Sequence, residues 1–413
     1  MTQKAFLARR IVTCDPARAT EGDPLGAIDD AAILFDDRSV SWVGPRDKLP
    51  AALDAEDLGD RVITPGLVDA HTHAAWAGSR HGEYAMRMAG ADYRAIAAAG
   101  GGILATHRAV MAASEAALAE ELAARLARMA SLGVTSCEVK SGYGLEPEGE
   151  HKQLAAIARA RSRDDLPHVV PTYLALHALP ESARSSRDLY VLKVATKLVP
   201  EIASGKLAEY VDVYVDQNAF TVEEARLVLE AARRAGIGAR LHVGQFADVG
   251  GAALAAQLGA ASADHLEHVG EADARAMAKA GTAAVLLPIA SFTLGQAPPP
   301  IATLRAAGVS LVVASDANPG TAPSESLPLA MALAVRSYGL TPAEVILGAT
   351  RLAAQSLGLY APAMPRPRGL LAPGARADLV VWDLPHEGAI VQPWGVSRAA
   401  RVLRDGREIA RAR

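Results

Sequence analysis

The feature that most constrains the fold of this 413-residue chain is an alternation of apolar runs with helical segments. Between residues 67 and 315, short runs rich in Val, Leu and Ala are separated by Ala-rich segments with the 3.6-residue period of amphipathic helices. Nearly continuous apolar strands between helices are typical of a parallel sheet covered on both faces. Eight such units in about 250–300 residues predict a (β/α)8 barrel. The strands are expected at Leu67–His73, Val134–Lys140, Val169–His177, Val211–Val215, Ala239–Val243, Ser262–His265, Thr282–Leu287 and Ser310–Ser315. Helices are expected at Glu115–Leu132, Pro147–Arg161, Val222–Ala235, Gly250–Leu258 and Glu271–Ala280.

The two ends of the chain have a different pattern. Short strand-like pieces occur at residues 5–12, 32–36 and 40–43, and similar pieces follow the barrel at 377–382 and 400–403. Because turn-forming residues separate these pieces, we expect both ends to combine into one small β-sandwich beside the barrel. The predicted fold class is therefore α/β, with the sandwich formed by residues 1–64 and 362–413 and the barrel by residues 65–361.

Composition and charge exclude several classes of protein. The chain is 50% hydrophobic and only 4% aromatic, so it can build a large aliphatic core. A formal charge of −4 without a basic block predicts no nucleic-acid partner. No apolar run approaches the roughly 20 residues of a membrane span, so we expect no membrane partner. The first residues do not resemble a secretory signal, and Cys14 and Cys137 cannot form a disulfide framework, which favours a cytoplasmic location.

Two histidines, His71 and His73, follow the apolar pair Leu67-Val68 at the end of the first expected strand. Residues i and i+2 of a strand point to the same face, so the two imidazoles should project side by side. Neutral imidazole nitrogen is a ligand for zinc and iron. The pair therefore indicates half of a metal site.

Other polar residues also lie where the expected strands end. The active residues of a (β/α)8 barrel lie where strands end and the following loops begin. Five of the eleven histidines occupy such positions, whereas surface histidines would be scattered over helices and loops. These five are His71, His73, His177, His242 and His265, and Gln245 and Asp316 follow the fifth and eighth strands. Their clustering predicts a metal-dependent active site.

These residues resemble the amidohydrolase superfamily, whose members combine this barrel with a small β-sandwich. In its mononuclear branch, the resemblance implies one divalent metal, Zn²⁺ or Fe²⁺, held by His71, His73, His242 and Asp316. Such an ion lowers the pKa of a bound water toward roughly 7. Asp316 would also take the proton from that water, and His265 would orient the nucleophile or polarise the scissile carbonyl.

Within this superfamily the chain resembles the imidazolonepropionases, ring-opening hydrolases of histidine degradation. The most specific segments are Lys140-Ser141-Gly142-Tyr143-Gly144-Leu145 and Asp316-Ala317-Asn318-Pro319-Gly320. Further similar segments are Gly90-Ala91-Asp92-Tyr93, Ala99–Ile103, His177–Pro180, Ala263–Glu267 and Leu286–Pro288. The resemblance implies hydrolysis of 4-imidazolone-5-propanoate to N-formimidoyl-L-glutamate by a metal-activated water. It also implies a homodimer.

The same resemblance implies the residues that contact a small substrate with a carboxylate arm. They are Arg80, Tyr143, His177 and Gln245, with Asn318, Gly320 and Thr321 contacting the ring-opened product. A guanidinium offers the fork of donors that a carboxylate prefers. The chain departs from the family pattern at Gly244, where an acidic residue is usual, and around Trp76–Arg80. Gln245, counted among the catalytic residues with Asp316 and His265, cannot act as a base, but its amide can donate and accept.

Two other functions fit parts of the pattern. A deaminase of a nucleobase-like ring would need an acid after the fifth strand, and Gln245 is not one. A catalytically silent scaffold would not need four ligand-competent residues at the metal positions.

A further expectation concerns the long connection from Ala74 to about Ser114, in which Gly100-Gly101-Gly102 offers a bend. We expect it to cover the barrel mouth and to contribute Arg80 and Tyr93.

Overall fold

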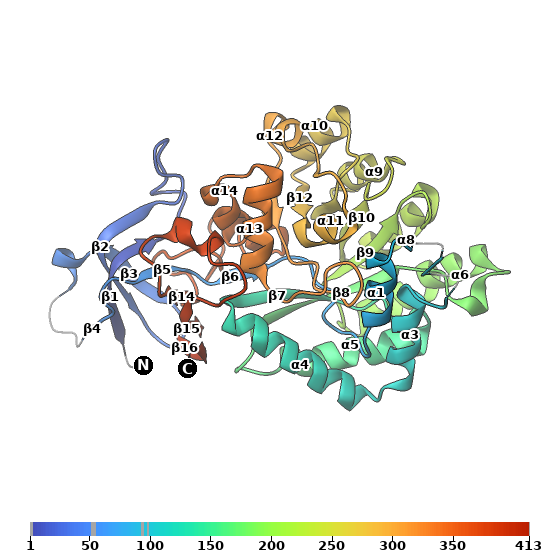
Figure 1. Ribbon diagram of the computed structural model, residues 1–413, viewed down its shortest axis with the longest axis horizontal. Coiled ribbons are helices and arrows are strands. Elements are labelled where there is room, and N and C mark those ends of the chain that lie inside the picture. The colour runs from blue at the N-terminus through green and yellow to red at the C-terminus, as the bar shows by residue number, and fades with distance from the viewer. Residues whose placement is uncertain (1–2, 51–54, 92–94, 97–98, 413) are drawn as a thin grey trace.

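The computed structural model describes residues 3–50, 55–91, 95–96 and 99–412. Its larger part is a barrel of parallel strands, on the right in Figure 1, with the helices outside. The strands follow one another around the barrel in chain order, from β6 to β13. They are β6 (Leu67–Asp69), β7 (Val134–Lys140), β8 (His168–Leu176), β9 (Tyr210–Val215), β10 (Gly238–Val243), β11 (Ser262–His265), β12 (Ala283–Leu286) and β13 (Leu311–Val313). The predicted barrel is confirmed.

Helices connect successive strands and bury their apolar sides against the barrel. The first long one, α4 (Glu115–Ser131), begins at the N-cap Ser114, whose side chain accepts a hydrogen bond from the amide of Ala117. The others are α5 (Pro147–Arg161), α6 (Arg187–Lys193), α7 (Val199–Ser204), α8 (Val222–Arg234), α9 (Gly251–Leu258), α10 (Glu271–Ala280), α11 (Pro288–Leu294), α12 (Ile301–Ala307), α13 (Leu327–Tyr338), α14 (Pro342–Gly348) and α15 (Arg351–Ser356). Short 3-10 or π turns are η1 (Arg46–Lys48), η2 (Glu181–Ala183), η3 (Val194–Leu198) and η4 (Glu387–Val391).

The barrel closes through the segment that carries the two leading histidines. Strand β6 ends at Asp69, four residues before the predicted end at His73. Beyond that point the backbone pairs with the end of β13: the amide of Asp316 donates to the carbonyl of His71, and that of His73 to Ala317. On the other side the amide of Lys140 donates to the carbonyl of Thr72. Neighbouring strands therefore fix the backbone on both sides of the His-x-His segment.

A separate sheet, on the left in Figure 1, joins the two ends of the chain. Its order is β16-β15-β14-β5-β1-β2-β3, with β4 paired to β1. The bounds are β1 (Lys4–Val12), β2 (Ala27–Phe35), β3 (Val40–Pro45), β4 (Ala55–Asp57), β5 (Val62–Pro65), β14 (Leu379–Trp382), β15 (Ala399–Arg404) and β16 (Arg407–Arg411). Strand β5 leads directly into β6, and β14 pairs with β5. The proposed limits of the two domains, 1–64 with 362–413 and 65–361, stay a prediction.

Each part of the molecule has its own apolar core. A large cluster fills the space between the barrel and its helices, and residues such as Leu122, Leu154 and Leu304 are fully buried in it. A smaller cluster, with Phe6, Ile33 and Val381, lies within the terminal sheet. Among the described residues, no helix has the length and apolar character needed to cross a membrane.

The long connection after β6 lies at the end of the barrel where the predicted site residues gather. It contains α1 (His81–Met88) and α3 (Ile103–Ala112). Arg87 of α1 donates to the carbonyl of Gly320, in the loop after β13. His107 of α3 contacts the carbonyl of Tyr143, in the loop after β7. The connection therefore covers the carboxyl ends of the strands, as expected for a segment over the barrel mouth.

Candidate active site

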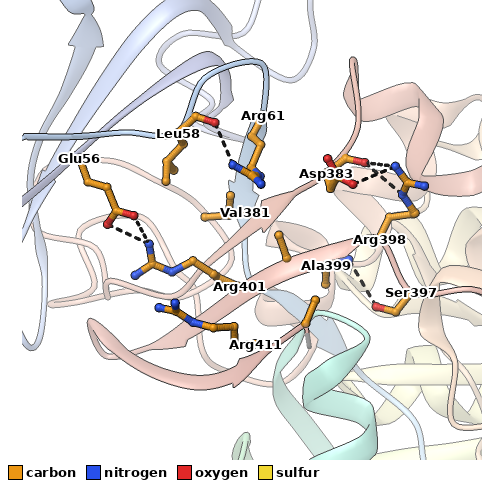
Figure 2. A pocket seen from close by; sticks show the side chains of 12 residues that line it. Glu56, Leu58, Arg61, Val381, Asp383, Ser397, Arg398, Ala399, Arg401 and Arg411 are labelled. Carbon is orange, nitrogen blue, oxygen red and sulfur yellow. Dashed lines mark hydrogen bonds and ion pairs between the residues drawn. The ribbon is translucent and has the colours of Figure 1, made fainter.

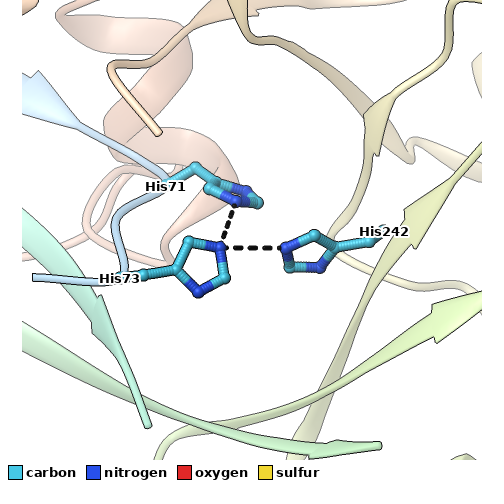
Figure 3. A group of neighbouring side chains, drawn as sticks. All are labelled: His71, His73 and His242. Atoms are coloured by element: carbon cyan, nitrogen blue, oxygen red, sulfur yellow. Dashed lines mark hydrogen bonds between the residues drawn. The ribbon is translucent and has the colours of Figure 1, made fainter. Parts of the chain in front are cut away.

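Three imidazoles converge at the barrel mouth (Figure 3). The Nε2 atom of His73 lies 3.3 Å from Nε2 of His71 and 3.2 Å from Nε2 of His242. The Oδ1 atom of Asp316 lies 3.5 Å from Nε2 of His71 and 3.4 Å from Nε2 of His73. The structure thus brings together the four residues that the sequence singled out as metal ligands.

These distances fit one metal ion at the centre of the four atoms. Ligands about 2.0–2.1 Å from a tetrahedral zinc lie about 3.3–3.4 Å from one another. Nitrogens that face each other with lone pairs cannot share a hydrogen bond, whereas a cation between them accepts all the lone pairs. Burial is the main cause that keeps the pKa of both imidazoles well below the usual value. The second cause is the charge of Lys140 for His71 and the charge of His177 for His73. Both rings are therefore neutral, as a metal ligand must be.

Carboxylates behind the imidazoles fix their tautomers. Nδ1 of His71 donates to Oδ2 of Asp264 at 2.6 Å, and Nδ1 of His242 contacts Asp212 at 3.1 Å. With the proton on Nδ1, each ring presents the lone pair of Nε2 to the centre. Such partners of ligand histidines set ring orientation and basicity. The Asp264–His71 contact was missed at the sequence level, although acidic residues inside the apolar strands β9 and β11 signalled it.

Two site residues have left-handed backbones. Asp316 has a φ of 54° and His265 a φ of 79°, a region that few residues other than glycine adopt, although Asn, Asp and His enter it more often than most. Strain of this kind persists where surrounding contacts enforce it, and it clusters at functional sites. Asp316 is held there by the hydrogen bond that its backbone amide donates to the carbonyl of His71. The end of β11 and the loop after β13 therefore hold these two side chains in place.

Asp316 and His265 have opposite tendencies toward charge. Burial raises the pKa of Asp316 to about 6, although the charges of His265 and His242 oppose the shift. Burial alone would lower the pKa of His265. The carboxylate of Glu267, whose Oε2 lies 3.8 Å from Nδ1 of His265, and the charge of Asp316 outweigh burial, so the pKa of His265 is raised. The pair provides a group able to accept a proton near neutral pH beside a group that favours its protonated form.

Two further predicted contacts, His177 and Tyr143, lie beside His73 at the barrel mouth. The ring of His177 stacks on His73 with centroids 5.2 Å apart, and Nδ1 donates to the carbonyl of Gly142. Burial lowers the pKa of His177 to about 3, so this imidazole is neutral. The ring of Tyr143 lies 5.2 Å from His177 and 6.0 Å from His73, and burial raises its pKa, so its hydroxyl keeps its proton.

Arg80 lies at the edge of the mouth, held by a residue that sequence reasoning missed. Its Nε and Nη2 atoms donate to Oε2 of Glu83 at 2.9 and 2.7 Å, and its side chain is 9% exposed. A Cβ placed on Gly320 would overlap the guanidinium, so the absence of a side chain there makes room for Arg80. A hollow of about 560 Å³ opens beside it, lined also by Trp76, Tyr84 and Pro319. The i, i+3 spacing of Arg80 and Glu83 was the available signal.

The remaining predicted contacts shape the loops around the centre. Oε1 of Gln245 accepts a hydrogen bond from the Tyr214 hydroxyl at 2.9 Å, which leaves its amide nitrogen as the donor. Oδ1 of Asn318 accepts from the amides of Gly320 and Thr321, at 2.9 and 2.7 Å, so Asn318 holds this loop together. Gly244 has a φ of 65°, which suits glycine. Tyr93 lies outside the described residues.

A groove of about 450 Å³ lies on the terminal sheet (Figure 2). Two of its arginines are paired with carboxylates, Arg401 with Glu56 at 2.9 Å and Arg398 with Asp383 at 3.0 Å, whereas Arg61 donates to the carbonyl of Leu58. No predicted site residue lines this groove. The chemistry therefore belongs to the barrel mouth.

Comparison with known proteins agrees with this geometry. A family model described as "Amidohydrolase family" matches residues 87–410. The chain is 43% identical over 391 residues to an imidazolonepropionase of Cupriavidus pinatubonensis, covering 94% of this chain and 91% of that protein. It is 44% identical over 384 residues to an imidazolonepropionase of Paracoccus denitrificans, covering 91% and 92%.

Solved structures share the fold at lower identity. A triazine hydrolase variant superposes with a TM-score of 0.74 at 18% identity, covering 98% of this chain and 95% of that chain. Guanine deaminase of E. coli gives a TM-score of 0.66 at 16% identity and covers both chains completely. At these identities the likeness establishes the fold alone. With the family model and the relatives taken together, the chain belongs to the amidohydrolase family and, within it, to the imidazolonepropionases.

Proposed function

We propose that the barrel mouth opens the ring of 4-imidazolone-5-propanoate by hydrolysis and releases N-formimidoyl-L-glutamate. The observation that carries this proposal is the convergence of three imidazoles and one carboxylate, with neighbouring ligand atoms 3.2–3.5 Å apart. The names of relatives at 41–44% identity support the choice of substrate. Like its family, the chain is a metal-dependent hydrolase of non-peptide C–N bonds in cyclic amides.

His71, His73, His242 and Asp316 would hold one divalent ion, Zn²⁺ or Fe²⁺, because both metals suit nitrogen and oxygen ligands. When bound, such an ion makes a water acidic enough to act as a nucleophile near neutral pH. Asp316, with its pKa raised to about 6, accepts the proton of the attacking water. His265 donates toward the carbonyl oxygen, where negative charge develops.

The other side chains hold the substrate. Arg80 binds the propionate arm, and the hydroxyl of Tyr143 donates a hydrogen bond to the arm or to the ring. His177 is neutral and donates its Nδ1 proton to Gly142, so its Nε2 accepts a hydrogen bond from an N–H of the ring. The amide nitrogen of Gln245 donates to the ring, because Tyr214 occupies its oxygen. The loop of Asn318, Gly320 and Thr321 contacts the opened product.

The test follows the ultraviolet absorbance of the imidazolone after enzyme is added, with cytosine and guanine as control substrates. We expect the absorbance to disappear with the imidazolone and no change with either nucleobase. Turnover of a nucleobase without turnover of the imidazolone would replace this proposal by the deaminase alternative. No turnover and no bound metal would favour the silent scaffold.

We also propose that the enzyme works in the cytoplasm as a homodimer. Both cysteines, Cys14 and Cys137, are buried and unpaired, which suits a reducing compartment. The dimer rests on the family resemblance. Light scattering of the purified protein decides it: a mass near twice 42.9 kDa is expected, and a mass of one chain would contradict it.

A further inference from the structure

A buried ionic network lies behind the imidazoles of the centre. Lys140 is completely buried, and its Nζ atom lies 2.7 Å from Oε1 of Glu138 and 2.7 Å from Oδ2 of Asp212. It also lies 3.8 Å from Oδ2 of Asp264. Arg240, equally buried, lies 3.2 Å from Glu138 and 3.8 Å from Asp264. Burying this many charges is costly unless close pairing and hydrogen bonds offset the loss of hydration.

The same carboxylates form a second group able to hold a metal. Asp212, Asp264 and His242 offer ligand atoms that all lie within 4.8 Å of one another. Oε2 of Glu138 and Oδ1 of Asp264 are buried and have no hydrogen-bond partner among the described residues. Unpartnered carboxylate oxygens in this arrangement suit hard divalent cations such as Mn²⁺. The ammonium of Lys140 already lies against the other oxygens of these carboxylates, 2.7 Å from Oε1 of Glu138 and 3.8 Å from Oδ2 of Asp264.

We propose that the Lys140 ammonium is a built-in cation that takes the place of a second divalent ion and keeps the centre mononuclear. An ammonium is a compact point charge with three donors, and here two of its contacts have the length of a strong charged hydrogen bond. Through Asp212 and Asp264 it also orients His242 and His71. Lys140 is thus a positioning residue rather than one that touches substrate.

Charge balance supports one ion rather than two. Glu138, Asp212, Asp264 and Asp316 are four carboxylates, and Lys140 and Arg240 are two cations, while the charges of His265 and its neighbour Glu267 cancel each other. One divalent ion makes this buried set neutral, whereas a second would leave it with two excess positive charges. Uncompensated charge in a buried site is strongly unfavourable. This inference rests on the proposed metal centre.

The test compares manganese binding by the wild-type protein, Lys140→Met and Lys152→Met. Methionine fills the space of the lysine stem without its charge. Lys152 is a matched control because its Nζ donates to the carbonyls of Met111 and Ala113 on the outside of the barrel. Proteins are equilibrated with excess Mn²⁺, freed of unbound ion, and examined by elemental analysis and electron paramagnetic resonance.

We expect one isolated Mn²⁺ per chain in the wild type and in Lys152→Met, and two ions with a spin-coupled signal in Lys140→Met. A folded Lys140→Met that still binds one ion would overturn the inference and leave the metal centre intact. Should Lys140→Met be recovered only unfolded, Lys140→Gln, which removes the charge and keeps a polar side chain, takes its place with the same two outcomes. A coupled pair of ions in the wild type would refute the inference in either case. A wild type that binds no ion would refute the metal centre itself.

Discussion

Replacing Arg80 by Ala tests how the site recognises a carboxylate. In the structure the guanidinium is nearly buried, and Nε and Nη2 are engaged by Glu83. The remaining donors face the loop of Gly320, where the propionate arm is proposed to bind. Removing the side chain therefore deletes the cation and also leaves the carboxylate of Glu83, which is 12% exposed, without its partner.

The expected loss follows from the contacts removed. A hydrogen bond to a charged group is worth about 1.5–3 kcal/mol, which corresponds to about 10- to 150-fold in substrate affinity. The unpaired Glu83 adds repulsion toward the substrate carboxylate. Replacing Glu83 by Ala in the same chain should therefore recover several-fold of the loss, because the two effects are coupled.

The assay is the decrease of imidazolone absorbance over a range of substrate concentrations, with metal content measured in parallel. We expect KM to rise and metal content to stay at the wild-type level in the single and the double variant. An unchanged KM in Arg80→Ala, or a KM that rises only with loss of metal, would refute the role of Arg80.

Three other changes test separate parts of the account. Gly320→Ala should displace the Arg80 guanidinium and raise KM while the protein stays folded; an unchanged KM would show that the close approach is irrelevant. Asp264→Asn should weaken metal binding by about 10- to 100-fold in competition with a chelator, because His71 loses its charged partner, and undiminished affinity would contradict this. Burial, and to a smaller extent the charge of Arg368, lowers the pKa of His168 from its usual 6.5 to about 3. Between these pH values the unfolded chain binds a proton at His168 that the folded protein does not bind. The free energy of unfolding should therefore fall as the pH drops from about 6.5 to 3, and His168 contributes at most about 1.4 kcal/mol per pH unit to this fall. In denaturant titrations His168→Gln should make the dependence on pH less steep, and the same steepness in both proteins would contradict the role of His168.

The barrel could be predicted because its elements are set by local periodicity. The helix expected at Pro147–Arg161 has those bounds in the structure, and the strand expected at Val134–Lys140 does as well. The strand expected to reach His73 ends at Asp69, because its continuation pairs with the end of β13 and with Lys140, partners distant in the sequence. Strand β2 begins at Ala27 rather than at residue 32, because pairing with β1 extends it through the exposed Asp29 and Asp30.

The site could be predicted only as far as residue type and strand position allow. The metal-ligand candidates stand at strand ends, where a barrel brings them together whatever the details of packing. The contacts that tune them depend on three-dimensional neighbours. Glu138 and Lys140 lie two residues apart on one strand, so their proximity could be expected. The hydrogen bond from Lys140 to Asp212 joins residues that are 72 positions apart in the sequence and lie on different strands. Likewise, nothing local to Gln245 indicates that Tyr214 occupies its oxygen.

The most direct test of the account removes the metal and returns it in measured amounts. The protein is dialysed against a chelator, and zinc or ferrous iron is added back in steps while hydrolysis of 4-imidazolone-5-propanoate is followed. We expect the metal-free protein to be inactive, and its activity to rise in proportion to added metal and to reach its maximum at one ion per chain. Full hydrolytic activity in the protein without metal would contradict it.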